Sequence, residues 1–352
     1  MNVNEQYMQR CIMLAVKGLG DVAPNPMVGC VIAHEGKIIG EGYHQKYGEP
    51  HAEVNAINSV TEKELLSHST LYVSLEPCAH QGKTPPCADL IIKNNIPSVV
   101  IGSIDPNPLV KGKGIEKLLR AGISVDSGIL EKECRELNKR FFTFHEKKRP
   151  YIILKWAQTA DGFIDKKRNF GDGQLPLKIS NDETKKLSLQ WRSEEQAIMV
   201  GANTALLDDP KLTARKAGKK DPLRVLIDRD LKIPAHYHLL DDSVPTMIFT
   251  SVKKRSSAHS TFVNIDFSSE ANVIAAVLGT LHKKNIQSLI VEGGTTLLDA
   301  FFEKDLWDEA RIIISPLKID TGVPAPVFHE KNRQFFSVDH VDNNEVKIYR
   351  HT

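Results

Sequence analysis

The sequence predicts two consecutive α/β domains, and three observations indicate this fold class. Apolar strand-like segments alternate with helix-like segments along the chain, which favours sheets covered by helices. The length of 352 residues is sufficient for two domains of ordinary size. A charged run meets a proline in HEKKRP, residues 145–150, and a new apolar strand, YIILKWA, follows directly. We therefore expect domains over residues 1–147 and 148–352.

The first domain is predicted to alternate strands and helices after an initial hairpin. MVGCVIAHEGKIIGEGYH, residues 27–44, has two apolar runs around a turn at His34 to Gly36 and is typical of that hairpin. Apolar spacing and flanking turn residues then predict, in order, a helix in HAEVNAINSV, a strand in STLYVSLEP, a helix in CADLIIKNN, a strand in PSVVIGSID, a helix in GIEKLLRAG and a last helix in ECRELNKRFFTFHEKK.

The second domain repeats the alternation. Short apolar runs predict strands in YIILKWA, AIMVGA, PLRVLID, PTMIFTS, QSLIVEGG and ARIIISP. Helical spacing predicts helices in NDETKKLSLQWRSEEQ and NVIAAVLGTLHKKN.

Composition narrows the class of protein. With 46 basic and 44 acidic residues, the formal charge of +2 predicts no large basic surface for nucleic acid, although small anionic ligands remain compatible with it. No apolar run has membrane-spanning length, and the first residues, MNVNEQYMQRCIML, lack the basic-then-apolar plan of a secretory signal. We therefore expect a cytoplasmic protein.

The cysteines suggest metal binding or catalysis. Five cysteines, an odd number at irregular spacing, argue against a disulfide framework. We expect Cys11, Cys30 and Cys134, which lie in apolar or helix-like stretches, in the core. Cys78 and Cys87 instead lie close together in EPCAHQGKTPPCADL, residues 76–90.

These two thiols combine with HAE, residues 51–53, into a candidate zinc site. Catalytic zinc takes three imidazole or thiolate ligands and leaves a fourth position for water, and His51, Cys78 and Cys87 supply such a set. We expect the N-terminus of the helix at Cys87 to lower the pKa of that thiol. Glu53 is the nearby carboxylate that would shuttle protons, in the His-x-Glu arrangement of zinc deaminases.

Two non-catalytic interpretations of this group are also open. A closed structural zinc site would result if His80 supplied a fourth ligand, and the cysteines could also be a simple redox pair. The catalytic interpretation is favoured because a closed site has no use for Glu53.

Three stretches resemble the deaminase domain of the bifunctional riboflavin-biosynthesis deaminase-reductase family: PNPMVGCVI, HAEVNAI and LEPCAHQGKTPPC. The most specific part of this resemblance is the loop of eight residues between the two cysteines. The resemblance implies a cytidine-deaminase-like α/β/α domain, a pyrimidine nucleotide as substrate, and contact between Asn25 and the ring. Asn25 lies between two prolines and could equally be a turn residue.

In the second domain, VEGGTTLLDAF, residues 291–301, places Gly293 and Gly294 between a buried strand and a helix. Backbone N–H groups at such a helix start can bind phosphate, although a simple tight turn is the alternative. The segment is not a GxGxxG fingerprint, which disfavours an ordinary Rossmann domain.

Three stretches together resemble the reductase domain of the same family, which is similar in fold to dihydrofolate reductase. They are this segment, LKWAQTADGFI and WRSEEQAIMVGANTALLDDPKLTAR. The resemblance implies reduction of the ribosyl group to ribityl with NADPH. The implied cofactor-binding residues are Ala157, Thr204, Asp208, Gly293, Gly294, Thr295, Thr296, Leu297, Leu298, Asp299 and Ala300. The implied substrate-binding residues are Lys155, Arg192, Leu212, Arg215 and Glu292.

Some of these residues have a purely structural interpretation as well as a functional one. The two arginines suit a phosphate because their planar forks bind its oxygens bidentately, but surface ion pairs are the alternative. The resemblance makes Lys155 and Asp208 candidates for proton transfer near the ribose. A lysine whose ammonium ends at the surface and a simple turn at Asp208 are the alternatives.

The sequence departs from the family at PLKIS, residues 176–180, where many members have Ser-x-Trp-Ile-Thr. Pro176 and Lys178 replace a substrate-contacting serine and a cofactor-contacting tryptophan. Lys178 is our hypothetical contact to the extra phosphate of NADPH.

The resemblance implies zinc-dependent hydrolytic deamination of a diamino-ribosylamino-pyrimidinone phosphate, followed by NADPH-dependent reduction. The alternatives are a nucleic-acid or nucleoside base deaminase with a non-reductase accessory domain, and a zinc-stabilised scaffold. A homo-oligomer is possible.

Overall fold

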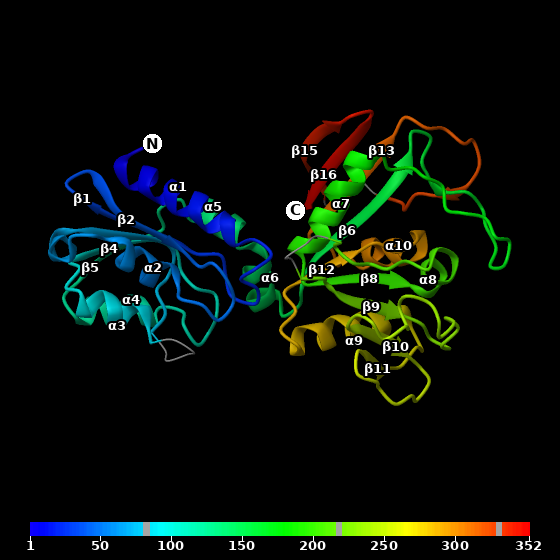
Figure 1. Cartoon of the computed structure of the whole chain (residues 1–352), viewed down its shortest axis with the longest axis horizontal. Coiled ribbons are helices and arrows are strands. Elements are labelled where there is room, and N and C mark those ends of the chain that lie inside the picture. The colour runs from blue at the N-terminus through cyan, green and yellow to red at the C-terminus, as the bar shows by residue number, and fades with distance from the viewer. Residues whose placement is uncertain (80–84, 216–219, 329–332) are drawn as a thin grey trace. The chain divides into compact units, whose positions relative to one another are not determined.

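The computed structural model describes residues 1–79, 85–215, 220–328 and 333–352, and it divides into two compact units, Met1–Lys148 and Arg149–Thr352 (Figure 1). Among these described residues, no helix is both long enough and apolar enough to cross a membrane.

The first unit is built on a five-stranded sheet in the order β2-β1-β3-β4-β5. β1 pairs antiparallel with β2 and β3, whereas β3, β4 and β5 are parallel, so the carboxyl ends of these three strands lie at the same edge. The strands are β1 (Gly29–His34), β2 (Lys37–Tyr43), β3 (Thr70–Leu75), β4 (Ser98–Ser103) and β5 (Ser124–Ser127).

Helices cover both faces of this sheet because its central strands are apolar on both sides. In β1, Cys30 and Ile32 pack toward α2, α3 and α4, while Val31 and Ala33 pack toward α1 and α5. Cys11, Cys30 and Cys134 are fully buried, which confirms their predicted core positions. The helices are α1 (Val3–Ala15), α2 (Ala52–Ser59), α3 (Cys87–Lys93), α4 (Lys113–Arg120), α5 (Glu131–Leu137) and α6 (Lys139–Lys147), with 3-10 turns η1 (Val16–Gly18) and η2 (Lys63–His68).

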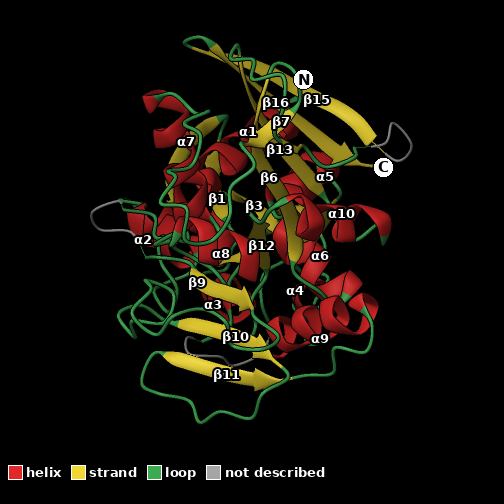
Figure 2. Ribbon diagram, turned by 90° about the vertical axis from the view of Figure 1, so that its right-hand side faces the viewer, coloured by secondary structure: helices red, strands yellow, loops and turns green. Residues whose placement is uncertain are grey.

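The second unit contains a nine-stranded sheet in the order β11-β10-β9-β8-β12-β6-β13-β16-β15. Neighbouring strands are parallel from β11 at one edge of the sheet across to β13. The pairs β13–β16 and β16–β15 are antiparallel. Figure 2 shows β9, β10 and β11 side by side at one edge. The strands are β6 (Tyr151–Thr159), β8 (Ala197–Gly201), β9 (Leu223–Ile227), β10 (Thr246–Thr250), β11 (Ser260–Asn264), β12 (Ser288–Val291), β13 (Glu309–Ser315), β15 (Arg333–Val341) and β16 (Asn344–His351).

Helices again lie on both faces of the sheet. α9 (Glu270–Lys283) and α10 (Thr295–Glu303) pack on one face, and α7 (Asp182–Glu194) and α8 (Ala202–Asp208) pack on the other. A two-stranded sheet of β7 (Phe163–Asp165) and β14 (Val323–Pro324) is separate. β12 lies between β6 and β8, although it follows both in sequence, and such reversals of strand order mark where open α/β sheets bind ligands.

Every predicted strand and helix is present, with one correction. The predicted last helix of the first unit is two helices, α5 and α6, because Asn138 leaves helical geometry at φ −104° and ψ 25°. Its side-chain amide instead bonds the N–H and the C=O of Met27, each at 2.8 Å. This bond pair joins the helix break to the segment before β1.

Gly29 allows α1 to approach β1 closely, because a Cβ added there would lie 1.9 Å from the carbonyl oxygen of Cys11. Replacing Gly29 by alanine should therefore destabilise the first unit by about 3 kcal/mol, since the helix must move away from the sheet. Urea unfolding of the full chain, followed by near-ultraviolet circular dichroism, measures this loss.

Gly279→Ala is the matched control for this substitution, because nothing lies within 4 Å of a Cβ added in the middle of α9. It should slightly stabilise the second unit through helix propensity. Equal stability of Gly29→Ala and the unmodified protein would contradict the close packing of α1 on β1.

Candidate active sites

The three predicted zinc ligands come together at the carboxyl edge of the first sheet. His51 is the N-cap of α2, Cys78 follows β3, and Cys87 is the first residue of α3. The Nδ1 atom of His51 lies 3.7 Å from the sulfur of Cys78 and 3.3 Å from the sulfur of Cys87. One candidate ligand atom from each residue lies within 4.8 Å of the other two.

Glycines in β2 place α2, and therefore His51, close to the sheet. A Cβ added at Gly42 would lie 2.4 Å from the backbone nitrogen of Ala56, so only glycine permits this approach. Pro86 precedes α3 with an extended backbone, φ −60° and ψ 136°, and directs the chain into Cys87.

The spacing of the ligand atoms fits zinc. Tetrahedral coordination with ordinary zinc–sulfur and zinc–nitrogen bond lengths separates such atoms by about 3.6 Å. The two measured sulfur–nitrogen distances, 3.3 and 3.7 Å, lie on either side of this value. Two thiolates and an imidazole also favour zinc over magnesium or manganese. His80, the alternative fourth ligand, lies outside the described residues.

The two candidate thiol ligands influence each other's pKa. The hydrogen bond from the Cys87 thiol lowers the pKa of Cys78, and His51 and the backbone N–H of Cys87, 3.3 Å from the Cys78 sulfur, lower it further. The same thiol bond and burial raise the pKa of Cys87. The expectation that the helix N-terminus lowers the pKa of Cys87 stays a prediction, because a bound zinc ion would deprotonate both thiols.

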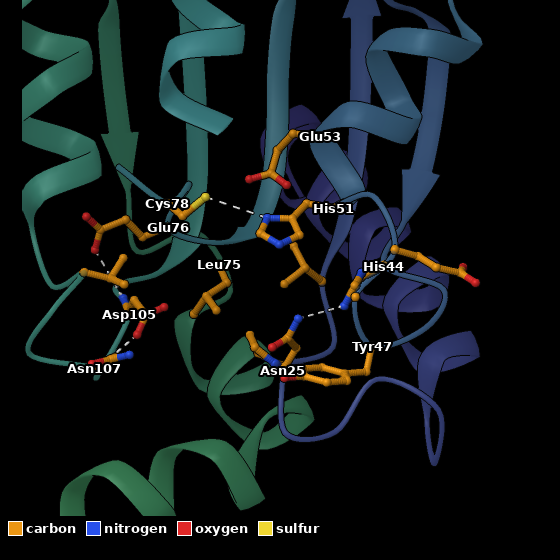
Figure 3. Close-up of a pocket in the computed structure, with 15 residues that line it drawn as sticks. Asn25, His44, Tyr47, His51, Glu53, Leu75, Glu76, Cys78, Asp105 and Asn107 are labelled. Atoms are coloured by element: carbon orange, nitrogen blue, oxygen red, sulfur yellow. Dashed lines mark hydrogen bonds between the residues drawn. The ribbon is translucent and has the colours of Figure 1, made fainter. Parts of the chain in front are cut away.

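Glu53 lies in the first turn of α2 and is only 3% exposed. Burial, and next the negative charge of Cys78, raise the pKa of its carboxyl group to about 7. A carboxyl group with a pKa near neutrality can both accept and release a proton, as a general acid–base catalyst must. Figure 3 shows the carboxyl group of Glu53 beside the imidazole of His51, on the same side of the ring as the sulfur of Cys78.

A cavity of about 260 Å³ opens in front of these residues. Asp105 and Asn107 lie on one side of it, and Asn25, His44 and Tyr47 lie on the other (Figure 3). Of these five wall residues, only Asn25 was predicted from the sequence. Their sequence signal is weak but real, since Asp105 and Asn107 follow β4 and His44 follows β2.

Hydrogen bonds fix the orientation of Asn25. The Nδ1 atom of His44 lies 3.1 Å from the carbonyl oxygen of Pro50, which can only accept, so Nδ1 carries the proton. Nε2 of His44 therefore accepts from the side-chain nitrogen of Asn25, at 3.1 Å. Burial lowers the pKa of His44, in agreement with a neutral ring. This leaves the Oδ1 atom of Asn25 as an acceptor for a ligand in the cavity.

In the second unit, three predicted substrate-binding residues form one buried charged group. Glu292, which follows β12, accepts hydrogen bonds from Arg192 of α7 at 2.7 and 3.2 Å. The ammonium nitrogen of Lys155, on β6, lies 3.9 Å from the same carboxylate. Burial lowers the pKa of Lys155, and although burial opposes ionisation of Glu292, the charges of Arg192 and Lys155 lower its pKa to about 2.

The glycine segment lies next to this group at the start of α10. The backbone N–H of Gly294 donates to the hydroxyl of Thr204 at 2.9 Å, which brings together two predicted cofactor residues. A Cβ added at Gly293 would lie 2.7 Å from the side chain of Leu297. Thr296 is exposed at the helix surface.

Other residues of this segment contact the protein itself. The hydroxyl of Thr295 donates to the carbonyl oxygen of Pro324 at 2.5 Å, and the N–H of Val327 donates to Asp299 at 2.9 Å. Leu298 and Ala300 are buried in the core, so their side chains pack against other apolar groups.

The remaining predicted residues are more dispersed. Ala157 is half-buried in β6, Leu212 is buried in the core, and Arg215 is exposed. Asp208 pairs with Arg168, which also pairs with Asp165.

Lys178 is 74% exposed and lies 3.3 Å from Asp182. The structure provides no contact between its side chain and the glycine segment among the described residues.

Two family models match the chain. The cytidine and deoxycytidylate deaminase zinc-binding region matches residues 1–103, and the RibD C-terminal domain matches residues 150–334. The riboflavin biosynthesis protein RibD of Aquifex aeolicus is 41% identical over 325 residues, covering 91% of this chain and 89% of that protein. The protein of the same name from Bacillus amyloliquefaciens is 38% identical, covering 98% of this chain and 93% of that protein.

Solved structures agree with these matches over the whole chain. The diaminohydroxyphosphoribosylaminopyrimidine deaminase/5-amino-6-(5-phosphoribosylamino)uracil reductase of Thermotoga maritima is 35% identical, with a TM-score of 0.87 and 99% of both chains covered. RibD of Acinetobacter baumannii is 32% identical, with a TM-score of 0.88 and the same coverage. These similarities do not favour a nucleic-acid base deaminase or a scaffold. The chain belongs to the RibD family of bifunctional riboflavin-biosynthesis enzymes, which combine a zinc-binding deaminase domain with an NADPH-dependent reductase domain.

Proposed function

We propose that residues 1–147 remove an amine from a diamino-ribosylamino-pyrimidinone phosphate and that residues 148–352 then reduce its ribosyl group to ribityl. The observation that carries this proposal is the group of His51, Cys78 and Cys87 beside the buried carboxyl of Glu53. The substrate named for the Thermotoga maritima relative supports the choice of pyrimidine.

In the deaminase cavity, each residue has a role that follows from its position. His51, Cys78 and Cys87 would hold a zinc ion, which when bound would supply a water of lowered pKa as the nucleophile near neutral pH. Glu53 takes one proton from the attacking water and gives it to a ring nitrogen as the water oxygen bonds to the amine-bearing carbon. Glu53 then passes the remaining hydroxyl proton to the amine, the C–N bond breaks, and ammonia leaves as the carbonyl forms. Asn25 accepts a hydrogen bond from the ring through its Oδ1 atom.

In the reductase unit, charge favours an anionic substrate. Arg192 and Lys155 carry two positive charges around the one negative charge of Glu292. This buried excess of positive charge favours the substrate phosphate. Arg215 can bind the phosphate bidentately, and Arg192 contributes its charge, because its Nε and Nη2 atoms already donate to Glu292. NADPH would supply the hydride when bound, and Lys155 would hold a proton for the ribose oxygen.

The glycine segment is our proposed site for the phosphates of the dinucleotide. Gly293 and Gly294 have no side chains to block its approach, and no side chain caps the start of α10, where backbone N–H groups can bind phosphate. The contacts of Lys178 and Asp208 with the cofactor remain predictions.

A cytoplasmic location is also a proposal, supported by the five unpaired cysteines. The oligomeric state remains a prediction.

The product mass after incubation with the proposed pyrimidine phosphate and NADPH tests this function. We expect a product that has exchanged an amine for oxygen and gained two hydrogens. Exchange without hydrogen gain would contradict the reductase proposal, and unchanged substrate from zinc-loaded protein would contradict the proposed pyrimidine.

Replacing Glu53 by glutamine should lower the rate of deamination by about 10²- to 10⁴-fold, because the amide cannot transfer protons. Zinc content should stay unchanged, since Glu53 is not a ligand, and reductase activity on the deaminated product serves as the internal control. Full deaminase activity in this variant would refute the proton-transfer role.

Glu292 should make the second unit sensitive to acid. Its folded pKa is lowered from 4.5 to about 2, so its stabilising effect is complete above pH 4.5 and is lost as the pH falls toward 2. The shift corresponds to about 3 kcal/mol. In Glu292→Gln, stability should depend less steeply on pH between 5 and 2.5, and should be lower at pH 7 because Lys155 and Arg192 lose their buried partner.

Denaturant titrations at several pH values measure this dependence. Glu303→Gln, at an exposed position at the end of α10, is the matched control and should keep the steep dependence. An unchanged acid profile in Glu292→Gln would show that the charged group is not the source of the sensitivity.

A further inference from the structure

Glu76 is a buried carboxylate to which the chemistry above assigns no role. It directly follows β3, is 4% exposed, and precedes Pro77 and the zinc ligand Cys78. Its backbone N–H donates to the carbonyl oxygen of Ser103 at 2.9 Å, which fixes its main chain to the end of β4. The side chain is therefore held at the edge of the sheet where the cavity opens.

Four backbone N–H groups donate to this carboxylate. Its Oε1 atom accepts from Gly114 at 2.9 Å and from Ile115 at 3.4 Å. Its Oε2 atom accepts from Gly112 at 3.0 Å and from Asp105 at 3.3 Å. A single side chain thus holds both ends of the segment that connects β4 to α4.

The held segment forms one wall of the deaminase cavity. Asp105 and Asn107 line the cavity from this segment, and Figure 3 shows Glu76 next to them. The segment also touches the chain beside Cys78, because a Cβ added at Gly114 would lie 2.0 Å from the carbonyl oxygen of Pro77. Glu76 therefore connects the backbone of a zinc ligand to the opposite wall of the cavity.

A carboxylate suits this position better than an amide does. Both oxygens of Glu76 face two N–H donors each, and two of the donors belong to the first turn of α4, whose dipole favours a negative charge. A glutamine has only one acceptor oxygen, so its NH₂ group would point at one pair of donors. The contacts at that end would be lost without a change in side-chain size.

We propose that Glu76 is a positioning residue for deamination, which sets the distance between the wall residues Asp105 and Asn107 and the reacting group formed by Glu53 and the zinc ligands. The inference rests on the proposed pyrimidine deamination. It assigns to Glu76 no contact with the substrate and no transfer of a proton.

The test compares Glu76→Gln with the unmodified full-length, zinc-loaded enzyme. We expect kcat/KM for deamination to fall by about 10- to 100-fold, mainly through a higher KM, because substrate-facing groups move. Zinc content and reductase activity on the deaminated product should stay unchanged. Hydrogen exchange should become faster at the amides of Asp105, Gly112 and Gly114, a readout independent of activity.

Glu116→Gln is the matched control, since this carboxylate lies on the exposed side of α4 and pairs with Arg120 at 2.5 Å. It should change neither deamination nor exchange in the wall segment. If Glu76→Gln fails to fold, Glu76→Asp replaces it, because aspartate keeps the charge but its shorter side chain cannot reach both pairs of donors.

A double variant with Asp105→Asn separates positioning from simple stabilisation. If Glu76 acts through the wall, the loss in Glu76→Gln/Asp105→Asn should be no larger than the greater single loss. Multiplied losses, normal kinetics in Glu76→Gln, or loss of zinc would each overturn the proposal. If the unmodified enzyme does not deaminate the pyrimidine, the proposed function fails first, and the inference fails with it.

Discussion

The parallel pairing of β3 with β4 is the constraint on which the deaminase site depends. A parallel pair requires a crossover, and here the crossover helix is α3, so its first residue returns to the edge where β3 ends. Cys78 at the end of β3 and Cys87 at the start of α3 therefore meet, although eight residues separate them. The close packing of α2 on β2 then adds His51 and Glu53. The strand and helix topology therefore brings the candidate zinc ligands together by itself.

The second unit applies the same topology to a different chemistry. Lys155 and Glu292 come from neighbouring parallel strands, β6 and β12, and Arg192 reaches them from α7. Here the group is a set of fixed charges. Burial makes each charge expensive unless the others are present, so the three residues depend on one another. The position of the glycine segment directly after Glu292 joins this charged group to the helix start proposed for the dinucleotide.

Much of the fold and the zinc site could be predicted because the signals are chemically restrictive. Few residue types bind zinc, so His51, Cys78 and Cys87 stood out in a chain with five cysteines. Asp105 and His44 did not, since single polar residues after strands are common and only folding places these two in one cavity.

Other features depend on tertiary contacts that local patterns do not contain. The break at Asn138 exists because its amide finds Met27, far away in sequence. Residues carried over as a continuous range near Gly293 include Leu298 and Ala300, which helical periodicity turns into the core. The hairpin of β15 and β16 was not predicted because most of β15 is exposed, which leaves little apolar alternation to detect.

The candidate metal ligands found among the described residues all lie in the unit Met1–Lys148. In the unit Arg149–Thr352, the buried group of Lys155, Arg192 and Glu292 is held together by its own opposite charges. We therefore expect a shortage of zinc to act on the deamination step first, before any NADPH is consumed in the reduction that follows it.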